Sequence, residues 1–205
     1  TGLVYAVVLG LIVVNVQDDH TDVRQSTIAE AGALGDIYDA LGGVDPARRG
    51  PLQAHVRRYL QIVVDDEWPA LRQGVASPRA EAELRALAAG VIALDEQHRG
   101  SQAVQQTLLN ELDAALDARR SRIFVGFRGI NRGTWAVVIL GAMIVIGFAA
   151  LFPLRARGRV AVVGLTASIF GLMLFLIVAT SRPLRGQLGV GPDAFVELAA
   201  DLDTR

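Results

Sequence analysis

The sequence predicts an all-α integral membrane protein in which a polar helical bundle is inserted between transmembrane hairpins. Hydrophobic residues make up 52% of the 205 residues, and the mean hydropathy is +0.37. The apolar residues are concentrated in three runs, which is not typical of a simple soluble domain. Between these runs, apolar residues recur with a period near that of an α-helix and show no strand alternation, which predicts amphipathic helices.

Two apolar runs in the second half of the sequence predict a transmembrane helical hairpin. Trp135–Phe152 and Val160–Ala179 contain no ionisable residue. At about 1.5 Å per residue, each run reaches about 27–30 Å, which matches the hydrocarbon core of a bilayer. We therefore predict transmembrane helices over 134–153 and 160–181, joined by a short basic turn over 154–159.

A shorter apolar run, Gly2–Val16, opens the sequence. Its length corresponds to about 22 Å of helix, and we interpret residues 1–16 as a transmembrane helix that ends an N-terminal hairpin. Because Thr1 already lies inside the run, with no initiating Met, we expect native sequence upstream. A buried core helix or a signal-peptide core is the alternative, although the basic leader and small-residue cleavage site of a signal peptide are absent.

The polar middle of the chain, residues 17–133, predicts four amphipathic helices with short connections, which together form a bundle. A glycine pair ends the first helix, and a capping residue followed by proline begins the second and the third. A Trp-Pro step kinks or ends the second helix, and a Gly-Ser step begins the fourth. In chain order these signals are Gly42-Gly43, Asp45-Pro46, Trp68-Pro69, Ser77-Pro78 and Gly100-Ser101. Residues 182–205 are predicted to be a tail with one short helix over 192–202.

The composition excludes several classes of function. The net charge of −1 gives no electrostatic basis for binding nucleic acid, and the absence of cysteine excludes disulfides, thiolate metal sites and thiol catalysis. His20, His55 and His98 lack metal-ligand spacing, and no serine lies in a nucleophile motif. We therefore expect no catalytic centre, no metal and no cofactor, and we do not expect an enzyme.

The string Asp65-Asp66-Glu67-Trp68-Pro69 is the most distinctive in the polar middle. Its carboxylates are the kind of ligand that Ca²⁺ or Mg²⁺ prefers. Successive helical side chains point about 100° apart, however, so three adjacent carboxylates do not converge on one ion. We therefore interpret the string as a solvated helix end with Trp68 packed beneath it.

The first span carries a candidate pore-lining stripe. At helical spacing an apolar segment leads into a polar and then an acidic one, and several copies around an axis would form a neck and a vestibule. The candidate pore stripe is Leu3, Val7, Leu11 and Asn15, and the candidate vestibule is Asp18 and Asp22. The alternative is a helix packed in its own bundle whose last turn meets water. The two complete spans hold no ionisable residue, which argues against a proton-coupled transporter but not against a channel.

The layout and several strings resemble the bacterial bestrophin-like domain family, whose members have two spans, a helical soluble region and two more spans. The resemblance rests on Val4–Leu9, Ala31–Leu41, Tyr59 with Val63–Pro69, Leu116–Arg120 and Arg182–Gly186. The two most specific strings supply the candidate family motif: Asp66, Glu67, Trp68 and Pro69, then Arg182, Pro183 and Arg185.

The resemblance implies a channel-type architecture, because bestrophins are pentameric anion channels with an apolar neck on the span that leads into the soluble domain. The sequence departs from bestrophins just after that span: the aromatic-rich segment is absent, and Gln17–Arg24 stands in its place. The acidic vestibule would favour cations over anions. The resemblance therefore implies the architecture, and the ion is left open.

The expected location is a bacterial cell membrane, crossed several times by the chain. The arginines in the turn over 154–159 favour a bundle outside the cell, but the larger number near the membrane ends on the bundle side, with the resemblance, favours a cytoplasmic bundle. The expected partners are the lipid bilayer and copies of the chain itself, a pentamer by analogy. The alternative is a non-conducting accessory or scaffold subunit, partnered by other subunits of a larger membrane complex.

Overall fold

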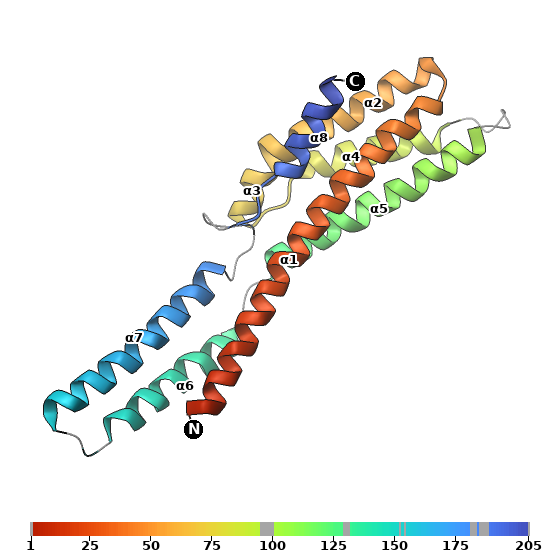
Figure 1. Cartoon of the computed structure of the whole chain (residues 1–205). Coiled ribbons are helices and arrows are strands. Elements are labelled where there is room, and N and C mark those ends of the chain that lie inside the picture. Colours follow the sequence, from red (N-terminus) through yellow and green to blue (C-terminus); the bar gives the residue numbers. More distant parts are fainter. Residues whose placement is uncertain are drawn as a thin grey trace. The chain divides into compact units, whose positions relative to one another are not determined.

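A computed structural model shows a helical chain, and it describes residues 2–94, 101–128, 132–151, 153, 155–180, 184 and 189–204 (Figure 1). Within these ranges there is no β-strand, so the all-α prediction is confirmed. The helices are α1 (Gly2–Ala40), η1 (Leu41–Gly43), α2 (Pro46–Ile62), η2 (Val63–Glu67), α3 (Trp68–Gln73), α4 (Pro78–Ile92), α5 (Ser101–Phe127), α6 (Arg132–Ala150), α7 (Ala156–Thr180) and α8 (Asp193–Thr204).

The chain forms two compact units, and α1 contributes to both of them. Unit 1 consists of residues 1–20 and 128–189, and unit 2 consists of residues 21–127 and 190–205. Residues 182–205 were predicted to be a tail, whereas residues 190–205 belong to unit 2. The physical reason is that Phe195 and Leu202 of α8 are completely buried there.

Unit 1 contains two helices that are long and apolar enough to cross a membrane. The candidate segments are Gly133–Ala150 of α6 and Ala156–Val178 of α7. The two helices pack through Val138, Ala142 and Ile177, but most of their large apolar side chains are exposed. An apolar helix surface that the chain itself leaves uncovered is expected where lipid covers it.

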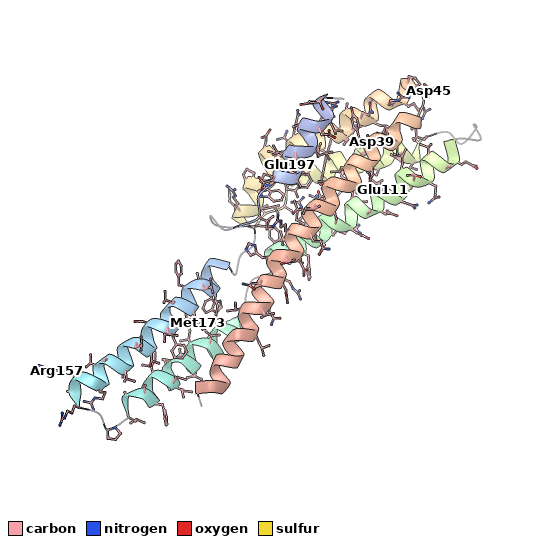
Figure 2. The ribbon with its side chains drawn as sticks, viewed as in Figure 1. Asp39, Asp45, Glu111, Arg157, Met173 and Glu197 are labelled. Atoms are coloured by element: carbon pink, nitrogen blue, oxygen red, sulfur yellow. The ribbon has the colours of Figure 1, made fainter. Side chains whose placement is uncertain are left out.

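The end of α6 and the start of α7 both lie earlier in the sequence than expected. Helix α7 begins at Ala156, within the basic turn that was placed at 154–159. Arg157 and Arg159 therefore lie in the first turns of α7, and Arg157 is labelled at that end in Figure 2. Arginine at the end of an apolar helix can extend towards lipid headgroups, so a charged first turn is compatible with a membrane span.

The helix boundaries of unit 2 follow the capping signals of the sequence. Helix α1 ends before Gly42-Gly43, where the chain forms the short 3₁₀ helix η1. The Asp45 side chain accepts a hydrogen bond from the Ala47 N–H (2.8 Å), and the Ser77 hydroxyl oxygen accepts one from the Ala80 N–H (3.4 Å). Both predicted N-caps are therefore confirmed.

Pro69 does not end its helix, contrary to one of the two outcomes expected for the Trp-Pro step. The chain continues from α2 through η2, a π-helical turn, into α3. In this turn the Trp68 N–H donates to the Val63 carbonyl, one residue further back than in an α-helix. The wider turn accommodates a proline that has no N–H to donate. The helix instead ends at Gly74, whose φ of 86° is left-handed.

Unit 2 is a bundle in which α1, α5, α4 and α2 follow one another around the core. Hydrogen bonds from side chains link each neighbouring pair, for example Ser26 with Ser121, Gln105 with the Val91 carbonyl, and His55 with Glu83. Helix α8 lies against α1 and α2, where Leu198 lies over Gly35 and the Leu202 carbonyl accepts a hydrogen bond from Arg57 (2.6 Å). The five helices surround one apolar core, which contains a group of charged side chains described below.

Candidate functional site

The pore-stripe residues that the structure describes lie on an uncovered face of α1. Leu11 is 61% exposed, and Asn15, Asp18 and Asp22 are also exposed. The side chains of Leu3 and Val7 lie outside the described residues. Val13, on another face of the helix, packs against the cluster that joins α6 and α7. Within the chain, Leu11 is therefore not a packing residue, and this face of α1 is available to water, lipid or another copy.

A second candidate site is buried in unit 2, and we refer to it as the charged core. It consists of Glu30 on α1, Tyr59 on α2, Glu67 on η2, and Arg119 and Arg122 on α5. Four of these side chains are fully inaccessible, and Arg119 is 7% exposed. The two carboxylates and the two guanidinium groups give the charged core a formal charge of zero. Buried charges destabilise a fold unless opposite charges compensate them in this way.

Glu30 and Arg122 form the central ion pair of the charged core. Arg122 Nε donates to Glu30 Oε2 (2.8 Å) and Arg122 Nη2 donates to Glu30 Oε1 (3.1 Å), so the pair is bidentate. The Tyr59 hydroxyl donates a further hydrogen bond to Glu30 Oε1 (2.5 Å). These contacts join α1, α2 and α5 at one level and fix which face of α1 points into the bundle.

Glu67 and Arg119 form the second ion pair. Arg119 Nη2 donates to Glu67 Oε1 (2.9 Å) and also to the Ser77 carbonyl (3.4 Å). Arg122 Nη2 lies 3.8 Å from Glu67 Oε2, which links this pair electrostatically to the first one. The π-helical turn η2 and the start of α4 are thereby tied to α5.

Two aromatic rings that contact each other cover the guanidinium group of Arg122. The group lies 4.8 Å from the centre of the Trp68 ring and 5.4 Å from that of the Phe195 ring, and the two rings meet edge to face. The Trp68 indole N–H donates to the Val190 carbonyl (3.1 Å). The segment that ends in α8 therefore closes the charged core through cation–π contacts and one hydrogen bond.

Burial and neighbouring charges set the ionisation of these groups. Burial raises the pKa of Tyr59 well above its usual value, so its hydroxyl keeps the proton that it donates to Glu30. Burial lowers the pKa of Arg122, but Glu30, Glu67 and Tyr59 together raise it by more, so Arg122 stays charged. Burial also raises the pKa of Glu67, and the charges of Arg122 and Arg119 oppose that rise.

A protein-family model described as the bestrophin-like domain matches residues 1–195. The chain belongs to the bestrophin-like family. This family is associated with membrane channels rather than with enzymes. Together with the two apolar helices of unit 1, it supports a membrane protein. Searches of curated proteins and of solved structures returned no match.

The bestrophin-like chain buries part of the candidate family motif. Trp68 is packed beneath the helix surface, as expected, but Glu67 is completely buried, so the interpretation of the whole acidic string as a solvated helix end was wrong for this residue. Asp66 accepts a hydrogen bond from the Ser77 hydroxyl (2.5 Å), and Pro69 is exposed on α3. Arg182, Pro183 and Arg185 lie outside the described residues.

The three adjacent carboxylates do not converge on one point, because Glu67 points to Arg119 inside the bundle and Asp66 points to Ser77. Among the residues that the structure describes, no group of three histidine or acidic side chains could hold a metal ion.

The charged core was missed in the sequence although its positions carry a recognisable signal. On α1 the buried positions include 23, 27, 30, 34 and 37, and on α5 they include 108, 112, 115, 119 and 122. This spacing of three and four residues is that of the inner positions of a helical bundle. A charged residue on such a stripe predicts a buried partner, and the stripe through Val56, Leu60 and Val63 reaches Glu67 in the same way.

The buried carboxyl group of Glu67 predicts a pH dependence of folding stability. Burial raises the pKa of the Glu67 carboxyl group above its usual value of 4.5, so protonation of this group stabilises the folded protein at pH values below 4.5. This stabilisation is lost as the pH rises through the raised pKa of the folded state. We therefore compare the melting temperature of Glu67→Gln with that of the unchanged protein at each pH. The difference, variant minus unchanged protein, is expected to be more positive near neutral pH than in mild acid.

Thermal unfolding of both proteins at the two pH values measures this difference. Glu81→Gln is the control, because a hydrogen bond from Arg85 lowers the pKa of the exposed Glu81. The contribution of the Glu81 carboxylate to folding stability is therefore lost as the pH falls, which is the opposite direction. A Glu67→Gln difference that is the same at both pH values would contradict the expected linkage.

Proposed function

We propose that this bestrophin-like protein is an integral membrane homo-oligomer that passes ions along its symmetry axis. In this proposal residues 1–16, 134–153 and 160–181 cross a bacterial cell membrane. The two apolar helices of unit 1 and the family membership support the membrane location. The bundle is proposed to lie on the cytoplasmic side.

The main observation behind this proposal is the continuity of α1 and the change in polarity along its exposed face. It is one unbroken helix from Gly2 to Ala40. Its exposed stripe changes from apolar at Leu11 to polar at Asn15 and acidic at Asp18 and Asp22. An apolar constriction can gate ions by excluding water, and carboxylates beyond it set the local ion concentration. Copies of α1 around an axis would supply both features.

The charged core supports this arrangement by fixing the rotation of α1 in the bundle. Glu30 lies eight residues beyond Asp22 on the same helix, about 80° further around it, and its bidentate pair with Arg122 holds its own face inwards. Asp22 then remains on the exposed side. In this proposal the core is a positioning element, and it does not contact the ions.

Cysteine modification provides the test, since the chain contains no cysteine of its own. We expect Leu11→Cys and Asn15→Cys to lose ion flux in proteoliposomes after treatment with a charged, water-soluble thiol reagent. The physical reason is that a bulky charged group in an apolar neck blocks water and ions. Val13→Cys is the matched control, because Val13 packs against α6 and α7 and should be unaffected.

Equal sensitivity of Leu11→Cys and Val13→Cys would show that the exposed stripe is not a pore lining. If an oligomer forms but the unmodified protein carries no flux under any ionic condition, ion passage is ruled out. The remaining function would then be that of a non-conducting accessory or scaffold subunit of a larger membrane complex.

A further inference from the structure

The surface of unit 2 has two opposite sides with unlike charge. Because α1, α5, α4 and α2 follow one another around the bundle, α1 and α5 form one side and α2 and α4 form the other (Figure 1). We define the acidic side as the exposed surface of α1 from Thr21 onwards together with α5. We define the basic side as the exposed surface of α2, η2, α3 and α4.

The acidic side carries more carboxylates than guanidinium groups. Asp39 and Glu111 mark its two helices in Figure 2. Among the described residues, its exposed charged side chains are Asp22, Asp36, Asp39, Asp113 and Asp117 against Arg24 and Arg120. Asp36 and Asp113 form no hydrogen bond or ion pair with described residues of the chain, so nothing in the described fold offsets their charge.

The basic side shows the reverse balance. Its exposed charged side chains in the described ranges are Arg48, Arg58, Arg72, Arg79 and Arg85 against Asp65 and Glu81. Arg58 pairs with Glu83 and Arg85 pairs with Glu81, but both arginine side chains remain more than half exposed. They can therefore accept a second carboxylate from outside the chain.

The opposite charges lie at the same level of the bundle. Helices α4 and α5 run antiparallel, since Arg119 contacts the Ser77 carbonyl near one end and Gln105 contacts the Val91 carbonyl near the other. Asp113 lies midway between these two contacts on α5, and Arg85 lies midway on α4. A copy placed beside this one at the same height would therefore bring Asp113 towards Arg85.

Exposed apolar side chains of the two sides also lie at the same level along the bundle. Ile28 and Phe124 on the acidic side are more than half exposed, as is Val75, which lies between α3 and α4 beside the basic side. Ile28 lies near the contact between Ser26 and Ser121, and Val75 lies near the contact between Ser77 and Arg119. Apolar contact at this level would supply binding energy that isolated surface ion pairs do not.

We propose that the acidic side of one copy packs against the basic side of the next copy. This inference rests on the proposed homo-oligomer and deepens it by naming the two surfaces that join. Because the two surfaces differ, the contact is heterologous and generates a ring when the rotation closes. Asp113, Asp117 and Asp36 would face Arg85, Arg79 and Arg58 across each contact, whereas Asp22 is left to the proposed pore lining.

Cross-linking between two differently tagged copies tests the contact. One copy carries Asp113→Cys, the other carries Arg85→Cys, and both are co-expressed and purified as the intact membrane protein. We expect a short thiol cross-linker to join the two tags in a mixed dimer. The matched control pairs Asp113→Cys with Glu197→Cys on α8, which lies outside both surfaces and should give no mixed dimer (Figure 2).

Charge reversal provides the second readout. Asp113→Arg with Asp117→Arg should weaken self-association about tenfold or more at low salt and reverse its salt dependence, because like charges then face each other and added salt screens their repulsion. Adding Arg85→Asp and Arg79→Asp to the same chain should restore association. These residues are exposed, so the fold of each variant should be unchanged.

The outcomes separate the interface from the proposed function. An oligomer that gives only Asp113→Cys homodimers, or no cross-link to Arg85→Cys, would overturn the interface and leave the homo-oligomer intact. A protein that is monomeric at all salt concentrations would overturn both.

Discussion

Replacing Arg122 with leucine is expected to destabilise the bundle by about 3–5 kcal/mol, the usual cost of removing one partner of a buried ion pair. The variant leaves the completely buried Glu30 without its bidentate partner and takes from Glu67 one of its two positive neighbours. It also removes the cation that the Trp68 and Phe195 rings both contact. Thermal unfolding of the purified protein, followed by far-UV circular dichroism, measures the loss.

Arg120→Leu is the matched control for this experiment, because Arg120 lies on the same helix but is exposed and, among the described residues, pairs only with Asp117 (3.3 Å). Its replacement should change the stability by less than about 1 kcal/mol. The double variant Glu30→Leu with Arg122→Leu should be more stable than Arg122→Leu, since it leaves no unpaired carboxylate at that position. Equal effects of Arg122→Leu and Arg120→Leu would show that the charged core does not hold the bundle together.

Replacing Phe195 with alanine is expected to cost about 3–5 kcal/mol, as for other large core aromatics. Its ring is completely buried, packs edge to face on Trp68 and lies over the Arg122 guanidinium group. Its loss exposes Trp68, so we also expect the tryptophan fluorescence to shift to longer wavelength. Both changes can be measured on the same sample by following fluorescence during thermal unfolding.

Val196→Ala is the control for Phe195→Ala, because Val196 is the next residue of α8 and is about half exposed. It should leave the stability and the fluorescence nearly unchanged. If the two variants behave alike, α8 does not close the charged core, and the grouping of residues 190–205 with the bundle would have no energetic basis.

The sequence was sufficient for the features that depend on local chemistry. The N-caps at Asp45 and Ser77 were predicted because a capping side chain acts on the N–H groups of its own first turn. The apolar runs predicted α6 and α7 because length and hydropathy alone define a candidate span. None of these predictions requires knowledge of a distant residue.

Features that depend on contacts between distant residues were not predictable in the same way. Glu67 and Arg119 are 52 positions apart in the sequence, and Glu30 and Arg122 are 92 positions apart, so no local pattern identifies them as partners. Their positions on buried stripes could have indicated burial, but not the choice of partner. The role of α8 was missed for a similar reason, since Phe195 acts through contacts with Trp68 and Arg122, which are distant from it in the sequence.

The homo-oligomeric arrangement is tested most directly by native mass spectrometry of the intact complex in nanodiscs. We predict one closed ring of identical subunits, a pentamer if the family resemblance extends to stoichiometry. A monomer, or one copy bound among unrelated subunits, would contradict the homo-oligomeric channel and leave the accessory subunit as the function of this bestrophin-like protein.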